Sequence, residues 1–137
     1  MTYKTDMNDG SKKYFMIIDD DEDDRMFFKQ ALNEMLTSSL SLEAKDGIEA
    51  LQLLGKTERK PDYIFLDINM PRMDGRECLL ELKSDATLKS IPVIMYSTSF
   101  TDDSIAELLA LGASGYLNKP TDMNKLPAQI LETIKDK

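Results

Sequence analysis

An acidic run from Asp19 to Asp24 places six carboxylates in an unbroken row, directly after an apolar segment. Two such charges about 4 Å apart repel by roughly 4 kcal/mol at an effective dielectric near 20, so a folded protein needs a reason to gather them. Other polar residues that could do chemistry stand at or just after later apolar segments: Asp67, Ser97, Thr98, Asn118 and Lys119. Carboxylates without nitrogen or sulfur ligands favour hard cations such as Mg²⁺. A carboxylate can also attack a phosphoryl group, whose oxygens a lysine and a hydroxyl would neutralise.

The elements that must position these residues alternate regularly along the chain. Apolar segments lie at 14–18, 40–44, 62–66, 92–97 and 115–118, and amphipathic segments at 22–37, near 48–54, 75–84, near 105–109 and 123–134. Near-continuous apolar segments are typical of central parallel strands, and the alternation within 40–44 is typical of an edge strand. Five such strand–helix units predict an α/β fold, a doubly wound parallel sheet with helices on both faces. Because ligands bind outside the carboxyl ends of these strands, we expect the polar residues to converge there.

Composition excludes several other kinds of site. The chain has 137 residues, which predicts one domain, and a net charge of −8, which argues against a nucleic-acid surface. It has no histidine and one cysteine, which excludes Ser-His-Asp, Cys-His and His-ligated zinc sites and any internal disulfide. There is no apolar run of membrane-spanning length and no signal peptide, so we expect a cytoplasmic protein with no membrane partner. Residues 1–12 are predicted to form a flexible tail and 13–137 the domain.

Four segments together resemble the receiver domains of two-component response regulators: "FMIIDDDEDD", "IFLDINMPRMDG", "IPVIMYSTS" and "ASGYLNKP". The resemblance covers about residues 14–135. It implies a flavodoxin-like (βα)₅ fold with strand order 2-1-3-4-5. It also implies transfer of a phosphoryl group from a histidine kinase or a phosphotransfer protein onto one aspartate, which by position is Asp67.

The resemblance assigns a role to each polar position. Asp19, Asp20, Asp67 and the backbone carbonyl of Asn69 would bind Mg²⁺, for which Mn²⁺ can substitute. Ser97 and Lys119 would contact the phosphoryl group, and Tyr116 would be the aromatic switch residue that follows Ser97. Thr98 departs from the alanine that many members carry, and would either crowd the phosphoryl group or donate to it. The Lys119–Pro120 bond would be cis, although only about 5–6% of X–Pro bonds are.

The rest of the acidic run has a simpler explanation. Asp21 to Asp24 open the segment 22–37, and acids in a first helical turn are stabilised by the helix dipole by about 0.3–1 kcal/mol each. Asp21 is a candidate N-cap residue. The run does not match a calcium-binding loop of the EF-hand type. That loop needs glycine at its sixth position and a carboxylate at its twelfth, and counted from Asp19 these positions hold Asp24 and Gln30.

We expect a stand-alone receiver, a signalling switch and not an enzyme. Its phosphorylation would change the surface formed by residues of about 105–134, where an unknown downstream protein or a second copy of the chain would bind. One alternative is a phosphatase of the haloacid dehalogenase type, which needs a second acid where Asn69 stands. A second alternative is a receiver-like binding module that is not phosphorylated.

Overall fold

The computed structural model describes residues 13–35 and 39–137. The predicted tail, 1–12, lies outside the described residues. None of the described helices has both the length and the apolar character needed to cross a lipid bilayer.

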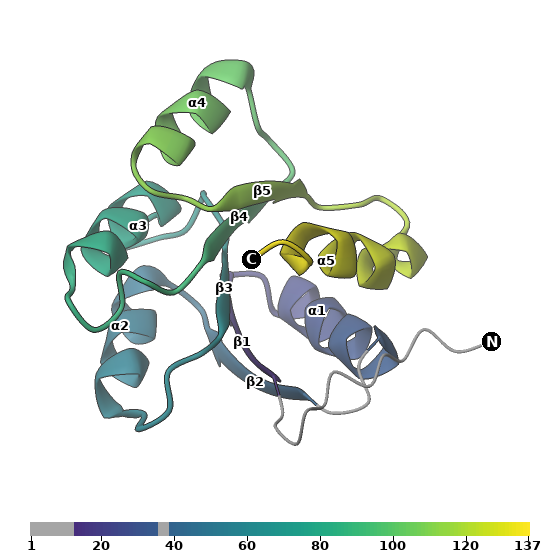
Figure 1. Ribbon diagram of the computed structural model, residues 1–137. Coiled ribbons are helices and arrows are strands. Elements are labelled where there is room, and N and C mark those ends of the chain that lie inside the picture. Colours follow the sequence, from purple (N-terminus) through teal and green to yellow (C-terminus); the bar gives the residue numbers. More distant parts are fainter. Residues whose placement is uncertain (1–12, 36–38) are drawn as a thin grey trace.

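Strands and helices alternate along the whole described chain (Figure 1). The strands are β1 (Lys13–Ile18), β2 (Ser39–Ala44), β3 (Tyr63–Leu66), β4 (Val93–Ser97) and β5 (Gly115–Asn118). The helices are α1 (Glu22–Met35), α2 (Gly47–Lys56), α3 (Gly75–Ser84), α4 (Asp102–Ala110) and α5 (Leu126–Ile134), with a 3₁₀ turn, η1 (Met123–Lys125), before α5. Pro127 stands in the first turn of α5, where proline is tolerated, and the 3₁₀ turn comes directly before it.

The strands form one parallel sheet in the order β2-β1-β3-β4-β5, which confirms the predicted fold class and strand order. Helices α1 and α5 cover one face, and α2, α3 and α4 lie toward the other (Figure 1). Alternate residues of the central strands therefore enter two separate apolar cores. In β1, for example, Phe15 and Ile17 belong to the α1–α5 core, whereas Met16 and Ile18 belong to the opposite one. Strand β2 lies at the edge of the sheet, as its alternating sequence predicted.

The backbone ladder of the sheet continues one residue beyond the strands. The Asp19 amide donates to the Ala44 carbonyl at 3.0 Å, and the Asp67 amide donates to the Ile18 carbonyl at 2.9 Å. On the other side, the Lys119 amide donates to the Ser97 carbonyl at 2.9 Å. These bonds fix three of the predicted site residues at the same edge of the sheet.

Gly75 allows the start of α3 to pack onto the backbone of Asp67. Asp74 caps the helix, and the Gly75 amide donates to the Ile68 carbonyl at 2.7 Å. A Cβ atom at position 75 would lie 2.1 Å from the Asp67 carbonyl oxygen and 2.7 Å from the Ile68 Cα. Both atoms belong to the backbone and cannot rotate away, so this close approach requires glycine.

Gly75→Ala should therefore destabilise the protein by about 1–3 kcal/mol, the usual cost of forcing extra atoms into a packed region. The measurement is urea unfolding. The matched control is Gly55→Ala in α2, where a Cβ would meet nothing within 4 Å; there stability should stay unchanged or rise by up to about 1 kcal/mol. Equal stability of the two variants would contradict the close approach at Gly75.

Candidate functional site

Three carboxylates converge at the carboxyl edge of the sheet. Asp19 is fully buried, Asp67 is 6% exposed, and Asp20 lies beside them at the surface. One oxygen from each lies within 4.8 Å of the other two. This is the convergence that the sequence predicted, and it brings like charges together where water screens them little.

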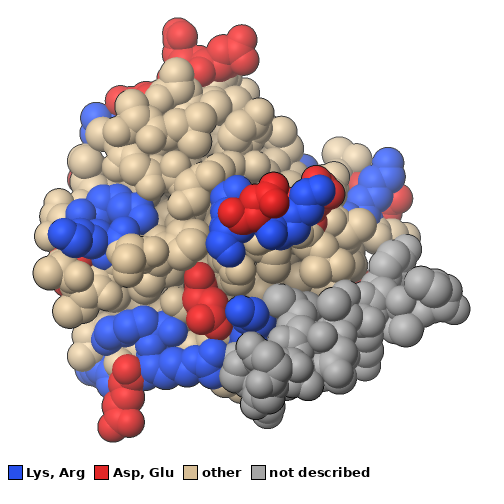
Figure 2. All heavy atoms as spheres, in the orientation of Figure 1, with Lys and Arg blue, Asp and Glu red and all other residues tan. Residues whose placement is uncertain are grey.

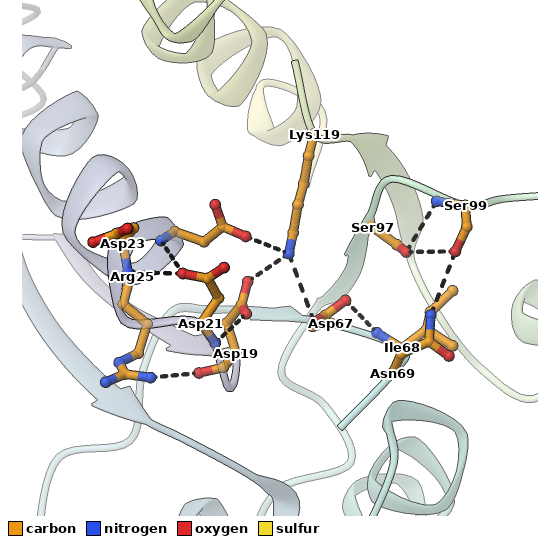
Figure 3. A network of polar contacts seen from close by, with 11 residues as sticks. Asp19, Asp21, Asp23, Arg25, Asp67, Ile68, Asn69, Ser97, Ser99 and Lys119 are labelled. Carbon is orange, nitrogen blue, oxygen red and sulfur yellow. Dashed lines mark hydrogen bonds and ion pairs between the residues drawn. The ribbon is translucent and has the colours of Figure 1, made fainter. Parts of the chain in front are cut away.

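Lys119 extends from the end of β5 into this group of acids (Figure 3). Its Nζ lies 2.8 Å from Asp19 Oδ2, 2.9 Å from Asp24 Oδ2 and 3.6 Å from Asp67 Oδ2. The ammonium also sits 5.3 Å from the centre of the Tyr96 ring, within the range of a cation–π contact. The lysine side chain is only 8% exposed, so its charge acts mainly on these neighbours.

Burial and mutual repulsion shift the pKa values of these groups. Burial raises the pKa of Asp67 to about 6, and the neighbouring Asp19 charge adds to the effect. Burial likewise raises the pKa of Asp19, against the opposing effect of Lys119. Burial alone would lower the pKa of Lys119, but its contacts with Asp19 and Asp24 outweigh that and raise it. The lysine therefore stays charged at neutral pH and partly neutralises the acids.

The acids use only part of their hydrogen-bonding capacity. Asp19 Oδ1 accepts the Asp21 amide at 2.9 Å, and Asp67 Oδ1 accepts the Ile68 amide at 2.8 Å (Figure 3). Asp19 Oδ2 is buried and, among the described residues, has its close ion pair with Lys119 but no hydrogen bond of ordinary geometry. A buried carboxylate oxygen in this state, within an oxygen-only donor set, fits a hard divalent cation.

Arg25 fixes the backbone on which the first acid stands. Its guanidinium donates to the Asp19 carbonyl at 2.7 Å and to Glu43 Oε1 at 2.8 Å. The arginine side chain is 15% exposed, and Glu43 also pairs with Lys29 of α1. The first turns of α1 are thus held against the end of β2, which keeps Asp19 in place.

The hydroxyl side of the site comes from β4 and the loop after it. Ser97 is buried, and its Oγ accepts the Ser99 amide at 3.2 Å. The Ser99 hydroxyl lies 3.4 Å from the side-chain nitrogen of Asn69 (Figure 3). Thr98, between the two serines, is exposed. The loops after β3 and β4 are therefore linked through Ser99.

Tyr116 is 44% exposed. Its ring packs edge-on against Phe100, with the ring centres 5.3 Å apart. Phe100 lies in the same β4–α4 loop as Ser99. This loop thus contacts both residues, Ser97 through the Ser99 amide and Tyr116 through the Phe100 ring.

One sequence prediction is wrong. Among the described residues there is no cis peptide bond, so the Lys119–Pro120 bond is trans. Trans is the ordinary preference of X–Pro bonds, by about 0.5–1 kcal/mol. With this isomer the Lys119 amide still pairs with Ser97 and its ammonium still reaches Asp19. The contacts of Lys119 therefore do not need the cis form.

Asp24 was not assigned to the site from the sequence alone. Asp21 is the N-cap residue as predicted, since its Oδ1 accepts the amides of Asp23 and Asp24. The Asp24 side chain, however, does more than begin a helix, because it binds Lys119. A signal was available: Asp24 stands four residues before the buried Phe28, and residues so spaced share one face of a helix.

A second unexpected contact holds the loop between β3 and α3. Arg72, in left-handed backbone conformation with φ of 65°, binds both carboxylate oxygens of Asp46 at 2.9 and 3.0 Å. Asp46 is buried and caps α2. The loop that carries Asn69 is thereby tied to the neighbouring helix.

Comparison with known proteins gives a consistent result. Residues 15–131 match the family described as response regulator receiver domain. Response regulator Rcp1 of Synechocystis sp. is 37% identical over a match that covers 60% of this chain and 59% of Rcp1. Response regulator MprA of Mycobacterium leprae is 34% identical, over 77% of this chain and 47% of MprA. The chain thus spans only part of the length of each of these relatives.

Solved structures resemble the fold over most of its length. The phosphorylated cyanobacterial phytochrome response regulator RcpA has a TM-score of 0.81 and 33% identity, covering 92% of this chain and 93% of its own. The Mn²⁺-bound form of Rcp1 has a TM-score of 0.78 and 28% identity, covering 90% and 94%. Chemotaxis protein CheY4 of Vibrio cholerae has a TM-score of 0.78 and 27% identity, covering 90% and 100%.

The raised pKa of Asp67 generates a prediction about stability. A carboxyl whose pKa is about 6 when folded, against 3.8 for the free side chain, binds more protons in the folded state between these values. Its contribution to the free energy of unfolding therefore falls as pH rises from about 4 to 6. Asp67→Asn removes this loss, so its stability relative to wild type should grow by about 1–3 kcal/mol between pH 4 and pH 7.

The measurement is urea unfolding of both proteins across this pH range, with a chelator present. The difference between variant and wild type is the quantity to follow, because acids that do not interact with Asp67 contribute equally to both. A difference that stays constant with pH would show that Asp67 titrates normally.

Proposed function

The chain belongs to the family of response regulator receiver domains, and on this basis we propose that it is a phosphorylation-dependent switch that accepts a phosphoryl group on Asp67. The observation that supports this most directly is the convergence of Asp67 with Asp19, Asp20 and Lys119 at one edge of the sheet. The proposed domain spans residues 13–137, since β1 begins at Lys13 and α5 ends at Ile134.

In the proposed reaction a carboxylate oxygen of Asp67 is the nucleophile. It forms a bond to the phosphorus of a phosphohistidine or of a small acyl phosphate, and the bond to the leaving group breaks. Lys119 neutralises the phosphoryl oxygens, and the Ser97 hydroxyl donates to one of them. Ionised Asp67 is the reactive form, and a pKa of about 6 leaves it mostly ionised at neutral pH.

Mg²⁺ is the cofactor that this donor set fits best, and the related Rcp1 has been crystallised with Mn²⁺. Asp19, Asp20, Asp67 and the backbone carbonyl of Asn69 would hold it. When bound, such a cation neutralises charge on the transferring phosphoryl group.

The switch is proposed to run through the β4–α4 loop. If the Ser97 hydroxyl turns toward a phosphoryl group, its bond with the Ser99 amide is weakened or lost. The loop that carries Ser99 also carries Phe100, which packs against Tyr116. A shift of this loop would release Tyr116 to turn inward, and the surface of α4, β5 and α5 would change for a partner.

The proposed phosphoryl donor is a sensor histidine kinase or a histidine phosphotransfer protein, and the output is an unknown protein or a second copy of this chain. On the face shown in Figure 2, Lys and Arg side chains stand in several groups, the widest at the lower left, with Asp and Glu side chains beside them, and the net charge of the chain is −8. This agrees with a protein partner in preference to nucleic acid. The cytoplasmic location stays a prediction.

A phosphatase of the haloacid dehalogenase type is less well supported. Asn69 stands two residues after Asp67, where that chemistry needs a carboxylic acid to protonate the leaving group. An amide cannot give up a proton in this way, and Asn69 instead lies beside Ser99.

Incubation with Mg²⁺ and acetyl phosphate should add one phosphoryl group, detected by intact mass spectrometry. The gain should disappear in Asp67→Asn, which lacks the nucleophile, and in the presence of a chelator. Wild-type protein that stays unmodified by acetyl phosphate and by phosphorylated histidine phosphotransfer proteins would instead support the binding-module alternative.

Mg²⁺ should also stabilise the folded protein in the absence of any phosphoryl donor. A cation bound only to the folded state adds about 2.7 kcal/mol at 100 times its dissociation constant, so the melting temperature should rise. Asp20→Ala should remove most of this rise, whereas Asp23→Ala, which removes the same charge from an exposed position, should preserve it. Potassium chloride of equal ionic strength controls for screening, and an unchanged wild-type melting curve would argue against the metal site.

A further inference from the structure

The role of Asp24 extends beyond the start of α1. Its Oδ2 accepts a hydrogen bond from Lys119 Nζ at 2.9 Å, between residues 95 positions apart in the sequence. The Asp24 side chain is 23% exposed, so water screens this contact only in part. Asp23, its neighbour in the same helical turn, is exposed, and its backbone amide donates to Asp21 Oδ1 at 2.9 Å.

The three acids around Lys119 contact it in different ways. Asp24 accepts a hydrogen bond of ordinary geometry. Asp19 Oδ2 is slightly closer, at 2.8 Å, but accepts no such bond, and Asp67 Oδ2 is 3.6 Å away. An ammonium group has three N–H donors and rotates freely about its last bond unless one of them is fixed. The bond to Asp24 fixes one of these donors and leaves two for the side of the site that Asp19 and Asp67 occupy.

The buried surroundings make this orientation matter. The Lys119 Nζ lies 5.3 Å from the centre of the Tyr96 ring and the lysine side chain is 8% exposed, so the ammonium has little room to move. A charged group that stabilises a transferring phosphoryl group acts best when it is already held in place, because then nothing must reorganise during the reaction.

We propose that Asp24 is a positioning residue for phosphoryl transfer, which holds the Lys119 ammonium so that its remaining N–H donors face the phosphoryl group on Asp67. This deepens the proposed function and rests on it. Asp24 itself need not touch the phosphoryl group or the cation, and its effect passes through Lys119.

The test compares phosphorylation kinetics of four proteins with acetyl phosphate and Mg²⁺: wild type, Asp24→Ala, Asp24→Asn and Asp23→Ala. Asp24→Ala should lower the maximal rate by about tenfold, the rate equivalent of one hydrogen bond between charged groups, with the half-saturating donor concentration changed less than about twofold. Asp24→Asn keeps an acceptor oxygen of the same size and should recover most of the rate. Asp23→Ala removes the same net charge from the same turn and should match wild type.

A second measurement is independent of phosphorylation. The ammonium protons of Lys119 should give a slowly exchanging signal in nitrogen-15 NMR spectra of the wild type and of Asp23→Ala, and this signal should be lost or broadened in Asp24→Ala. If wild-type protein is not phosphorylated at all, the proposed function fails, while this signal still reports whether the contact exists. Two results would overturn the positioning role. One is an Asp24→Ala protein that matches Asp23→Ala in both measurements. The other is a faster reaction in both Asp24 variants, which would make Asp24 an electrostatic brake.

Discussion

The backbone ladder between the ends of β1, β2 and β3 holds Asp19 and Asp67 together against their mutual repulsion. Each amide is bonded to a carbonyl of the neighbouring strand, so neither residue can move away without leaving a buried polar group unpaired, at about 1–3 kcal/mol. The repulsion is therefore built into the fold, and it adds to burial, the larger cause, in raising the pKa of Asp67. Lys119, which the ladder fixes from the other side of the sheet, offsets part of it.

The apolar core on the α1–α5 side continues directly into this charged site. Phe28 of α1 contacts both Phe65 of β3 and Tyr96 of β4, and the Tyr96 ring lies beneath the Lys119 ammonium. The same helix supplies Asp24 one turn before Phe28. Packing of α1 on the sheet therefore sets the position of an apolar ring and of a charged group at the same time. A change in that packing would therefore move both the Tyr96 ring and the Asp24 carboxylate relative to Lys119.

The parts that could be predicted from the sequence are those set by local pattern and topology. The apolar segments predicted the strands, and a parallel sheet places the carboxyl ends of its strands at one edge. The convergence at that edge could therefore be predicted for Asp19, Asp20, Asp67 and Lys119. The contact of Asp24 was missed because its helix-start role was already a sufficient explanation of an acid at that position. The trans bond before Pro120 could not be foreseen, because the two isomers differ by so little energy and the resemblance favoured the cis form.

Contacts between separate loops could not be predicted from the sequence either. The pairing of Arg72 with Asp46 depends on a left-handed residue that is not glycine, which no local pattern marks. The contact of Tyr116 with Phe100 could not be predicted either, since it depends on how the β4–α4 loop folds back. In each case the partner is chosen by tertiary packing and not by spacing.

Gly75 has a consequence for how this sequence can change over time. Every other amino acid carries a Cβ atom, so each missense mutation of its codon introduces the same overlap with the Asp67 backbone. A position without any functional group should thus tolerate substitution poorly, whereas the exposed, charged Asp23 should tolerate it well. Mutational scanning that maps intolerance would find the site partly through a residue that takes no part in its chemistry.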